Sequence, residues 1–173
     1  MNEAERMLDA EKTIEKYNSL LYRTCFVMLK NKHDVEDVVQ ETFVKYITFQ
    51  GDFVSEVHKR AWLLRVSQNK CKDLIKSHKI REYVPFEEVE EVLSFEQRFE
   101  ELAIEEFMKI FDLNYKYKSV VVFCWIEGYT IQETANILGI SVSAVKMRLK
   151  RAREKIKVIY EEIYMKEVDA NEQ

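Results

Sequence analysis

The sequence has few of the residues that bend or break a chain, with three glycines and one proline among 173 residues. Tight turns depend on Gly, Pro, Asn and Asp, so this scarcity argues against a β-rich fold and favours long helices. Hydrophobic residues make up 47% of the chain, which is enough to build a core. We therefore expect an all-α protein of one medium domain or two small ones.

Membrane, export and disulfide features are also missing from the sequence. No run of about 18 apolar residues is present, so no membrane-spanning helix is predicted. The N-terminus is charged from Glu3 onward and has no apolar signal-peptide segment. Cys25, Cys71 and Cys124 are far apart and form no C-x-x-C pair, which is typical of reduced, buried cysteines. We expect a cytoplasmic protein without membrane insertion.

Motifs of catalysis are absent as well. The sequence has no glycine-rich phosphate loop, no nucleophile elbow and no His/Cys metal cluster. A metal site on the acidic segment that begins at Asp34 is conceivable, but that segment lacks the Glu-x-x-His pairing of carboxylate di-metal bundles. The sequence predicts no enzyme, no cofactor, no catalytic residue and no metal site.

The net charge of −4 is unevenly distributed along the chain. Residues 1–80 carry 14 Lys and Arg against 12 Asp and Glu, residues 81–106 carry 2 against 10, and residues 107–173 carry 11 against 9. An acidic segment therefore separates two mildly basic halves. This pattern favours a nucleic-acid-binding protein with an acidic connector over a uniformly acidic enzyme.

Residues 129–155 predict a pair of helices joined by a short turn. Apolar residues recur at helical spacing on both helices: Ile131, Ala135 and Leu138, then Val142, Val145, Leu149 and Ala152. Gly139 can adopt the positive φ that ends the first helix, and Ser141 can cap the second. Such a pair is a helix-turn-helix, whose second helix normally enters the DNA major groove. Seven Lys and Arg face one anion, Glu154, over residues 146–157.

Three further helices are predicted in the first half, over residues 11–29, from a cap at Asp34 to about 47, and over 58–79. Residues 50–57 break the periodicity and form a loop. Residues 81–94 contain the only proline and are acidic, so they predict a linker, after which helices resume at Phe95 and over 117–126. The expected organisation is two helical bundles, 1–80 and 95–173, joined by the acidic linker 81–94.

Three motifs resemble those of the extracytoplasmic-function (ECF) RNA polymerase sigma factors of bacteria. Residues 34–43 (DVEDVVQETF) are similar to the family's D-A-E-D-x-x-Q-E-x-F signature in region 2. Residues 61–75 (AWLLRVSQNKCKDLI) resemble its W-L-x-x-I-A-x-N-x-x-x-D helix, and residues 128–153 resemble its region 4 helix-turn-helix. Three positions depart from the family pattern. Residues 113–116 replace the Pro pair usual before the region 4 helix, Ala144 replaces a Thr at the start of the recognition helix, and Ser67 replaces the usual Ala before Asn69.

The resemblance implies a protein that binds core RNA polymerase and directs transcription initiation at promoters with defined −10 and −35 elements. It implies core polymerase, with its β′ and β subunits, as the partner, and docking on the helical clamp of β′ through Asp34, Asp37, Gln40 and Glu41. It implies −10 DNA contacts from Lys59, Arg60, Asn69 and Lys70, with help from the loop around Phe49–Phe53. It implies −35 contacts from Ser143, Lys146, Met147, Arg148, Lys150 and Arg151, and it allows an anti-sigma factor as a further partner.

Chemistry supports these assignments and leaves alternatives open. Cations track phosphates, aromatics stack on unpaired bases, amides read base edges, and Arg binds guanine bidentately. The acidic face formed by Asp37, Gln40 and Glu41 has a solvated surface as its alternative, the acidic linker could equally be a solvated tether, and Trp62 suits a core position better than a DNA contact. Two other functions remain: a stand-alone DNA-binding regulator, which has no use for the acidic face, and a decoy that sequesters polymerase.

Overall fold

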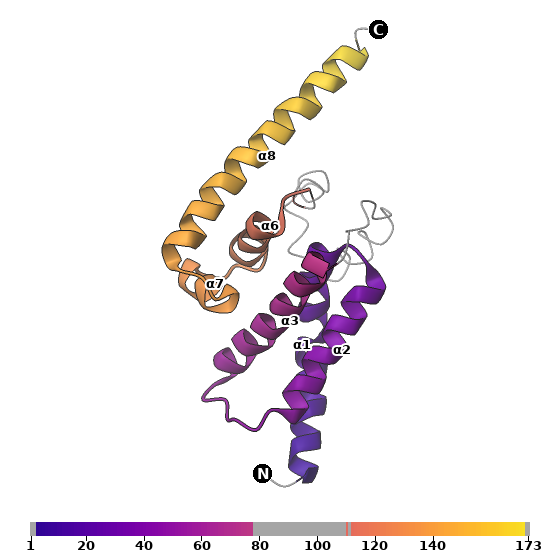
Figure 1. Ribbon diagram of the computed structural model, residues 1–173, viewed down its shortest axis with the longest axis vertical. Helices are drawn as coiled ribbons and strands as arrows, with labels where there is room; N and C mark the ends of the chain where they lie inside the picture. The colour runs from indigo at the N-terminus through magenta and orange to yellow at the C-terminus, as the bar shows by residue number, and fades with distance from the viewer. Residues whose placement is uncertain (1–2, 78–109, 111, 172–173) are drawn as a thin grey trace. The chain divides into compact units, whose positions relative to one another are not determined.

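A computed structural model describes residues 3–77, 110 and 112–171, and the side chains of 5–77, 110 and 112–158 (Figure 1). All its elements in these ranges are helical: α1 (Glu3–Leu29), α2 (Lys32–Thr48), α3 (Glu56–Ser77), α6 (Tyr115–Val121), the π-helix η2 (Val122–Ile126), α7 (Ile131–Leu138) and α8 (Val142–Asn171). The all-α prediction is confirmed. The predicted linker 81–94 and the helix expected to begin at Phe95 lie outside the described residues.

The chain divides into two compact units, and the first is a three-helix bundle. In it α1 packs against both α2 and α3, which also pack against each other (Figure 1). Fully buried side chains from all three helices meet in its core, among them Leu21, Val35, Leu63 and Leu64. Each such aliphatic side chain contributes roughly 1.5–3 kcal/mol when it leaves water. This core fixes which faces of α2 and α3 remain outside.

The three cysteines are free thiols, as expected. Cys25 and Cys71 are buried in the core of the first unit, whereas Cys124 in the second unit is half-buried. Burial raises the pKa of the Cys124 thiol, which favours its protonated form over the nucleophilic thiolate. The cysteines therefore act mainly as small packing residues.

The predicted starts of the first two helices are wrong. Helix α1 begins at Glu3 and not at residue 11; its first turns expose Met7 and Leu8 and so lack the apolar stripe from which the start was predicted. Helix α2 is capped by Asn31, whose Oδ1 accepts a hydrogen bond of 3.1 Å from the Asp34 backbone N–H. Asp34 therefore lies in the first turn, where its charge still complements the helix dipole.

In the second unit α6 packs along α8 and continues into η2. The predicted single helix over 117–126 begins earlier, with Asn114 as its cap, and widens at its end. The Glu127 N–H reaches back five residues to the Val122 carbonyl at 2.9 Å, which is the π-helical pattern. The wide turn leaves Trp125 41% exposed while Phe123 is fully buried.

The predicted turn between α7 and α8 is confirmed. Gly139 has φ +64°, and the Ile140 N–H donates to the Ala135 carbonyl at 3.1 Å, which closes α7. The Ser141 Oγ accepts a hydrogen bond of 3.1 Å from the Ala144 N–H and so caps α8. The first residues of α8 are thereby held in a fixed place after the turn.

Candidate functional site

The outer face of α2 exposes polar and apolar side chains together. Asp37, Gln40 and Glu41 are exposed, whereas Asp34 is half-buried. Val44 and Ile47 continue the same face with 59% and 53% of their surface exposed. Because Val35, Val38, Val39 and Phe43 on the opposite side enter the core, this face cannot turn inward. We call it the acidic face, and it suits a partner that offers cations beside an apolar surface.

Two residues predicted for different partners meet between α2 and α3. The Lys70 ammonium, predicted to contact −10 DNA, pairs with the carboxylate of Glu41, predicted to contact polymerase. Only 21% of the Lys70 side chain is exposed, against 62% for Glu41. Asp37 and Gln40 are consequently the clearer candidates for a contact with an outside partner.

Helix α3 divides the other predicted DNA contacts between two of its sides. Asn69 is exposed, and exposed Lys72 and Lys76 follow at i+3 and i+7, so these three share a face. Arg60 lies at i−4 from Leu64 and i−7 from Ser67, both buried, and it is itself half-buried. The structure therefore places Asn69 beside Lys72 and Lys76, on a different side of α3 from Arg60.

Lys59 is already engaged within the protein. Its Nζ lies 3.0 Å from Asp9 Oδ1 and 3.3 Å from Glu56 Oε1, and 12% of the side chain is exposed. A lysine held in this way by two carboxylates is poorly placed to follow a phosphate backbone.

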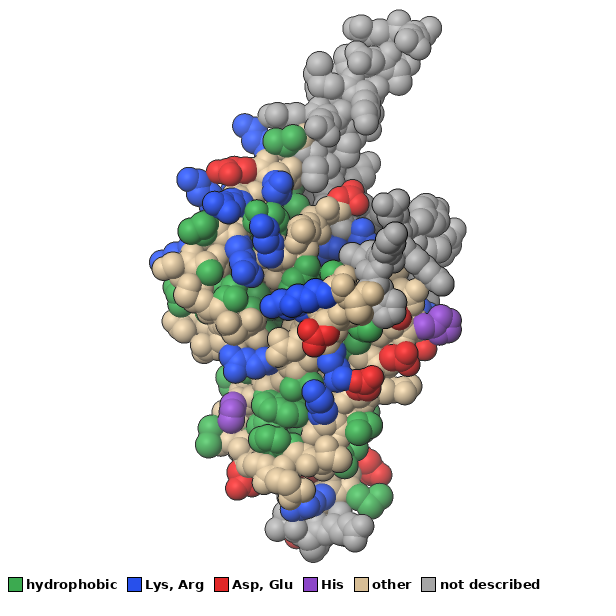
Figure 2. Space-filling view, viewed as in Figure 1, with side chains coloured by type: hydrophobic (Ala, Val, Ile, Leu, Met, Phe, Trp, Pro, Cys, Tyr) green, Lys and Arg blue, Asp and Glu red, His purple; other side chains and the backbone are tan. Residues whose placement is uncertain are grey.

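Aromatic rings gather where the loop 49–55 meets α3. Trp62 is half-buried, with ring centroids 5.0 Å from Phe49 and 5.5 Å from Phe53. Phe49 is 40% exposed. Apolar side chains are visible over the start of α3 in Figure 2. Trp62 is thus part of a ring cluster at the surface. The cluster offers stacking faces at the start of α3, the helix that also carries Asn69.

Helix α8 carries the predicted −35 contacts on its open side. Ser143, Lys146, Met147, Lys150 and Arg151 are exposed and recur at i, i+3, i+4, i+7 and i+8, so they form one face. Lys and Arg side chains gather over α8 and α6 in Figure 2.

One predicted −35 residue lies away from that face. Arg148 is half-buried. It lies at i+3 from Val145 and at i−4 from Ala152, and both of these residues are fully buried. The structure therefore brings five of the six predicted −35 residues together and leaves Arg148 at the edge.

Later cations of α8 contact aromatic rings of the same unit. The Arg153 guanidinium lies 5.6 Å from the Trp125 ring centroid, and the Lys155 ammonium lies 5.6 Å from that of Tyr117. Cation–π contacts at exposed sites contribute roughly 0.5–1 kcal/mol. These residues help to hold α8 on η2 and α6, in addition to any contact with phosphates.

Helix α7 begins with a reciprocal pair of hydrogen bonds that was not predicted from the sequence. The Thr130 N–H donates to Glu133 Oε2 at 2.8 Å, and the Glu133 N–H donates to Thr130 Oγ1 at 3.2 Å. This is a capping box, and its T-x-x-E pattern is visible in the sequence. Glu133 therefore has a structural role and is not a plain surface residue.

The residues that the structure describes carry neither a membrane-spanning segment nor a cluster of metal ligands. In that part of the chain no helix is both long and apolar enough to cross a membrane. Nor does any group of three or more His, Cys, Asp or Glu in the same ranges lie together so as to hold a metal ion.

Comparison with known proteins gives matches in both units. Residues 13–80 match the family model Sigma-70 region 2, and residues 112–156 match Sigma-70, region 4. The chain is 28% identical to the ECF RNA polymerase sigma factor SigW of Bacillus subtilis over 158 residues, which span 83% of this chain and 84% of SigW. It is 30% identical over 139 residues to the RNA polymerase sigma factor CnrH of Cupriavidus metallidurans, 73% of each chain.

Solved structures agree with the sequence relatives. CnrH in complex with the cytosolic domain of CnrY matches with a TM-score of 0.63 and 26% identity, over 88% of this chain and 87% of CnrH. The sigma factor RpoE of Bartonella quintana, in complex with the anti-sigma factor NepR, shares the fold with a TM-score of 0.59 at 15% identity, over 88% of this chain and 97% of RpoE. The two matched regions and these relatives show that the chain belongs to the ECF RNA polymerase sigma factors, which are not enzymes and which direct promoter-specific transcription initiation.

Proposed function

We propose a division of the sigma-factor function among three parts of the chain. Residues 1–80 bind core polymerase and the −10 element, residues 81–94 are an acidic linker, and residues 95–173 bind the −35 element. The observation that carries this proposal is a contrast of charge. Helix α2 exposes Asp37 and Glu41, whereas α8 has seven cations and one anion over residues 146–157.

Core polymerase docks on the acidic face of α2. Carboxylates steer the approach of a basic partner, and the exposed Val44 and Ile47 supply apolar area at the contact. Gln40 can donate and accept hydrogen bonds there. Glu41 takes part as well, although its pairing with Lys70 makes part of its charge unavailable.

Melted −10 DNA binds along α3 and the loop before it. Asn69 reads a base edge, Lys72 and Lys76 follow the phosphates from the same helix face, and the rings of Phe49 and Phe53 offer stacking surfaces. Lys70 and Arg60 border this surface.

Duplex −35 DNA binds the exposed face of α8. In helix-turn-helix proteins the first turns of the second helix normally lie in the major groove, which supports this assignment. Lys146, Lys150 and Arg151 supply cations for base edges and phosphates, and Met147, 53% exposed, supplies an apolar contact. Arg148 borders this face.

We further propose a cytoplasmic protein, because a sigma factor works with RNA polymerase. An anti-sigma factor is a partner we also propose, since RpoE was solved in complex with NepR, an anti-sigma factor. A pull-down from the native host with the full chain as bait tests this partner, and recovery of polymerase subunits alone would contradict it.

A gel-shift experiment tests the proposed function. The probes are a random pool of duplexes that contain a central melted segment, and the retained DNA is sequenced. We expect the free protein to retain little DNA and its complex with core polymerase to enrich two separated motifs. Enrichment of one duplex motif by the free protein would indicate a stand-alone regulator. Core binding without enrichment of any motif would indicate a decoy.

A further inference from the structure

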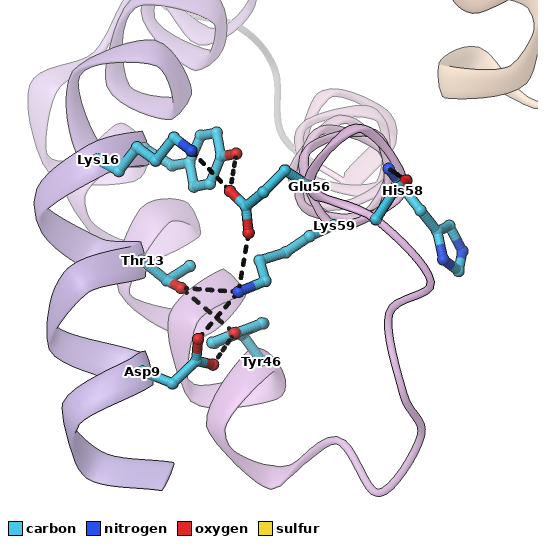
Figure 3. A network of polar contacts seen from close by, with 9 residues as sticks. Asp9, Thr13, Lys16, Tyr46, Glu56, His58 and Lys59 are labelled. Atoms are coloured by element: carbon cyan, nitrogen blue, oxygen red, sulfur yellow. Dashed lines mark hydrogen bonds and ion pairs between the residues drawn. The ribbon is translucent and has the colours of Figure 1, made fainter. Parts of the chain in front are cut away.

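The loop 49–55 is tied at both ends to one face of α1 (Figure 3). Tyr46 lies in the last turns of α2 before the loop, and Glu56 and Lys59 lie in the first turn of α3 after it. All three reach α1 residues that recur at i, i+4, i+7 and i+8: Asp9, Thr13, Lys16 and Tyr17. The two ends of the loop therefore share a common support.

Lys59 and Asp9 are at the centre of this network (Figure 3). The Lys59 Nζ donates to Asp9 Oδ1 at 3.0 Å and to Thr13 Oγ1 at 3.5 Å. The Tyr46 hydroxyl donates to the other oxygen of Asp9 and accepts a hydrogen bond of 3.2 Å from Thr13 Oγ1. Asp9 thus joins the helix before the loop to the helix after it.

Glu56 makes a second connection to α1. Its Oε2 accepts from Lys16 Nζ at 2.6 Å and from the Tyr17 hydroxyl at 2.9 Å. Its Oε1 lies 3.3 Å from Lys59 Nζ. The first turn of α3 therefore has two independent attachments to α1.

Ring contacts extend this support into the loop itself. The Lys59 ammonium lies 5.5 Å from the centroid of the Tyr46 ring, and that ring stacks on Phe53 at 5.7 Å. Phe53 lies 5.1 Å from Phe49, and both contact Trp62. A continuous chain of contacts leads from the Asp9–Lys59 pair to the rings that the proposed function assigns to unpaired bases.

Electrostatics keep the pair ionised. Burial acts to raise the pKa of the Asp9 carboxyl, but hydrogen bonds from Tyr46 and Lys59 outweigh it and hold that pKa below its ordinary value. Burial acts to lower the pKa of Lys59, and its bonds to Tyr46, Asp9 and Glu56 outweigh it and raise that pKa. The pair is charged throughout the physiological range.

We propose that Asp9 and Lys59 are positioning residues for single-stranded DNA: their ion pair fixes Tyr46 and the loop 49–55, and neither residue touches the strand. This inference rests on the proposed −10 function of the loop. It differs from the expectation that Lys59 binds DNA directly. It also gives Asp9 a positive role in DNA binding, although the charge of a carboxylate alone would repel DNA phosphates.

The Asp9→Asn substitution separates the two ideas by the sign of its effect. Removal of a negative charge should strengthen DNA binding if charge alone matters. The positioning role predicts the opposite, an affinity lower by about tenfold, because the neutral amide weakens the bonds to Lys59 and Tyr46. The matched control is Glu11→Gln, which removes a charge from an exposed position on the same helix.

The measurement uses holoenzyme assembled from the full chain and core polymerase. The probe is a fluorescent single-stranded oligonucleotide that wild-type holoenzyme enriches from a random pool. Core affinity of each variant is measured in parallel, so that a misfolded variant is recognised. Lys59→Met should weaken probe binding at every salt concentration and leave the slope of log affinity against log salt concentration unchanged. Loss of a direct phosphate contact would instead make that slope shallower by about 0.7.

The outcomes are distinct. Weaker binding by Asp9→Asn with intact core affinity, and wild-type binding by Glu11→Gln, would support the positioning role. Equal or stronger binding by Asp9→Asn, or a reduced slope for Lys59→Met, would overturn it while leaving the −10 function standing. If wild-type holoenzyme enriches no single strand at all, the proposed −10 function fails and the positioning role fails with it.

Discussion

At the scale of single residues, Glu56 links charge to the stability of the first unit. The Lys16 ammonium, followed by the Tyr17 hydroxyl and Lys59, lowers the pKa of Glu56 from 4.5 to about 2. A carboxyl with a lowered pKa stabilises the fold above its unfolded-state value, and this contribution disappears as the pH falls toward the folded-state value. The effect is modest because the Glu56 side chain is 56% exposed.

We therefore predict a difference between wild type and Glu56→Gln in acid. The urea midpoint of the wild type should fall more steeply between about pH 4.5 and pH 2 than that of Glu56→Gln. Lys16→Met, which removes the strongest partner, should also flatten the curve. Parallel curves for wild type and Glu56→Gln would show that this carboxylate is not stabilised in the fold.

A second residue-scale prediction concerns α8. Lys146 is exposed, whereas Arg148 is half-buried at the edge of the packed side. Lys146→Ala should make the slope of log affinity against log salt concentration shallower by about one for holoenzyme binding to −35 duplex, as expected for the loss of one phosphate contact. Arg148→Ala should change it less. A larger change for Arg148→Ala in fluorescence anisotropy titrations would contradict the assigned face.

Residue roles were the least predictable part of the sequence. Composition placed Lys59, Arg60 and Asn69 on one basic helix. Only tertiary packing shows that Lys59 pairs with Asp9, which lies fifty residues earlier in the sequence, on α1. Periodicity could have separated Asn69 from Arg60, because buried Leu64 and Ser67 share a side of α3 with Arg60. Ion pairs between distant helices leave no such local pattern.

At the scale of elements, the turn before α8 depends on Gly139. Its φ of +64° lies in the left-handed region, where a Cβ costs roughly 1–2 kcal/mol. Gly139→Ala should lower the unfolding free energy reported by Trp125 by about 1 kcal/mol, and Gly139→Asn should lower it less, because Asn tolerates this conformation. Urea unfolding followed by Trp125 fluorescence in a Trp62→Phe background measures both. Equal losses for Ala and Asn would contradict the conformational cause.

The acidic face of α2 gives a prediction for docking. Asp37→Arg reverses an exposed charge, so it should weaken core polymerase binding about 100-fold or more without unfolding the protein. Circular dichroism confirms the fold, and surface-immobilised core polymerase gives the affinity. The control is Glu11→Arg on α1. Wild-type affinity of Asp37→Arg would refute the docking assignment.

Helix ends were predictable where local chemistry sets them and unpredictable elsewhere. Gly139 and Ser141 marked the turn because both act on their own neighbours. The start of α1 was missed by eight residues, since its first turns expose Met7 and Leu8 and lack an apolar stripe. The cap of α2 was assigned to Asp34 and not to Asn31, because both residue types cap helices well.

At the scale of the whole molecule, the class of fold and the family were readable from the sequence. Scarce Gly and Pro indicated helices, and three motifs indicated a sigma factor, which the matches to regions 2 and 4 show. The charge map assigned opposite signs to the connector and to α8. Charge and motifs carry no information on how a whole promoter is engaged, because that geometry is a property of the holoenzyme.

Run-off transcription over a random promoter library tests this account most directly. Purified full-length protein is added to core RNA polymerase, and the transcripts are sequenced together with their templates. We predict start sites at a fixed distance downstream of two spaced motifs, absent with core alone and with Asp37→Arg. Transcripts no more frequent or selective than those of core alone would contradict the central claim.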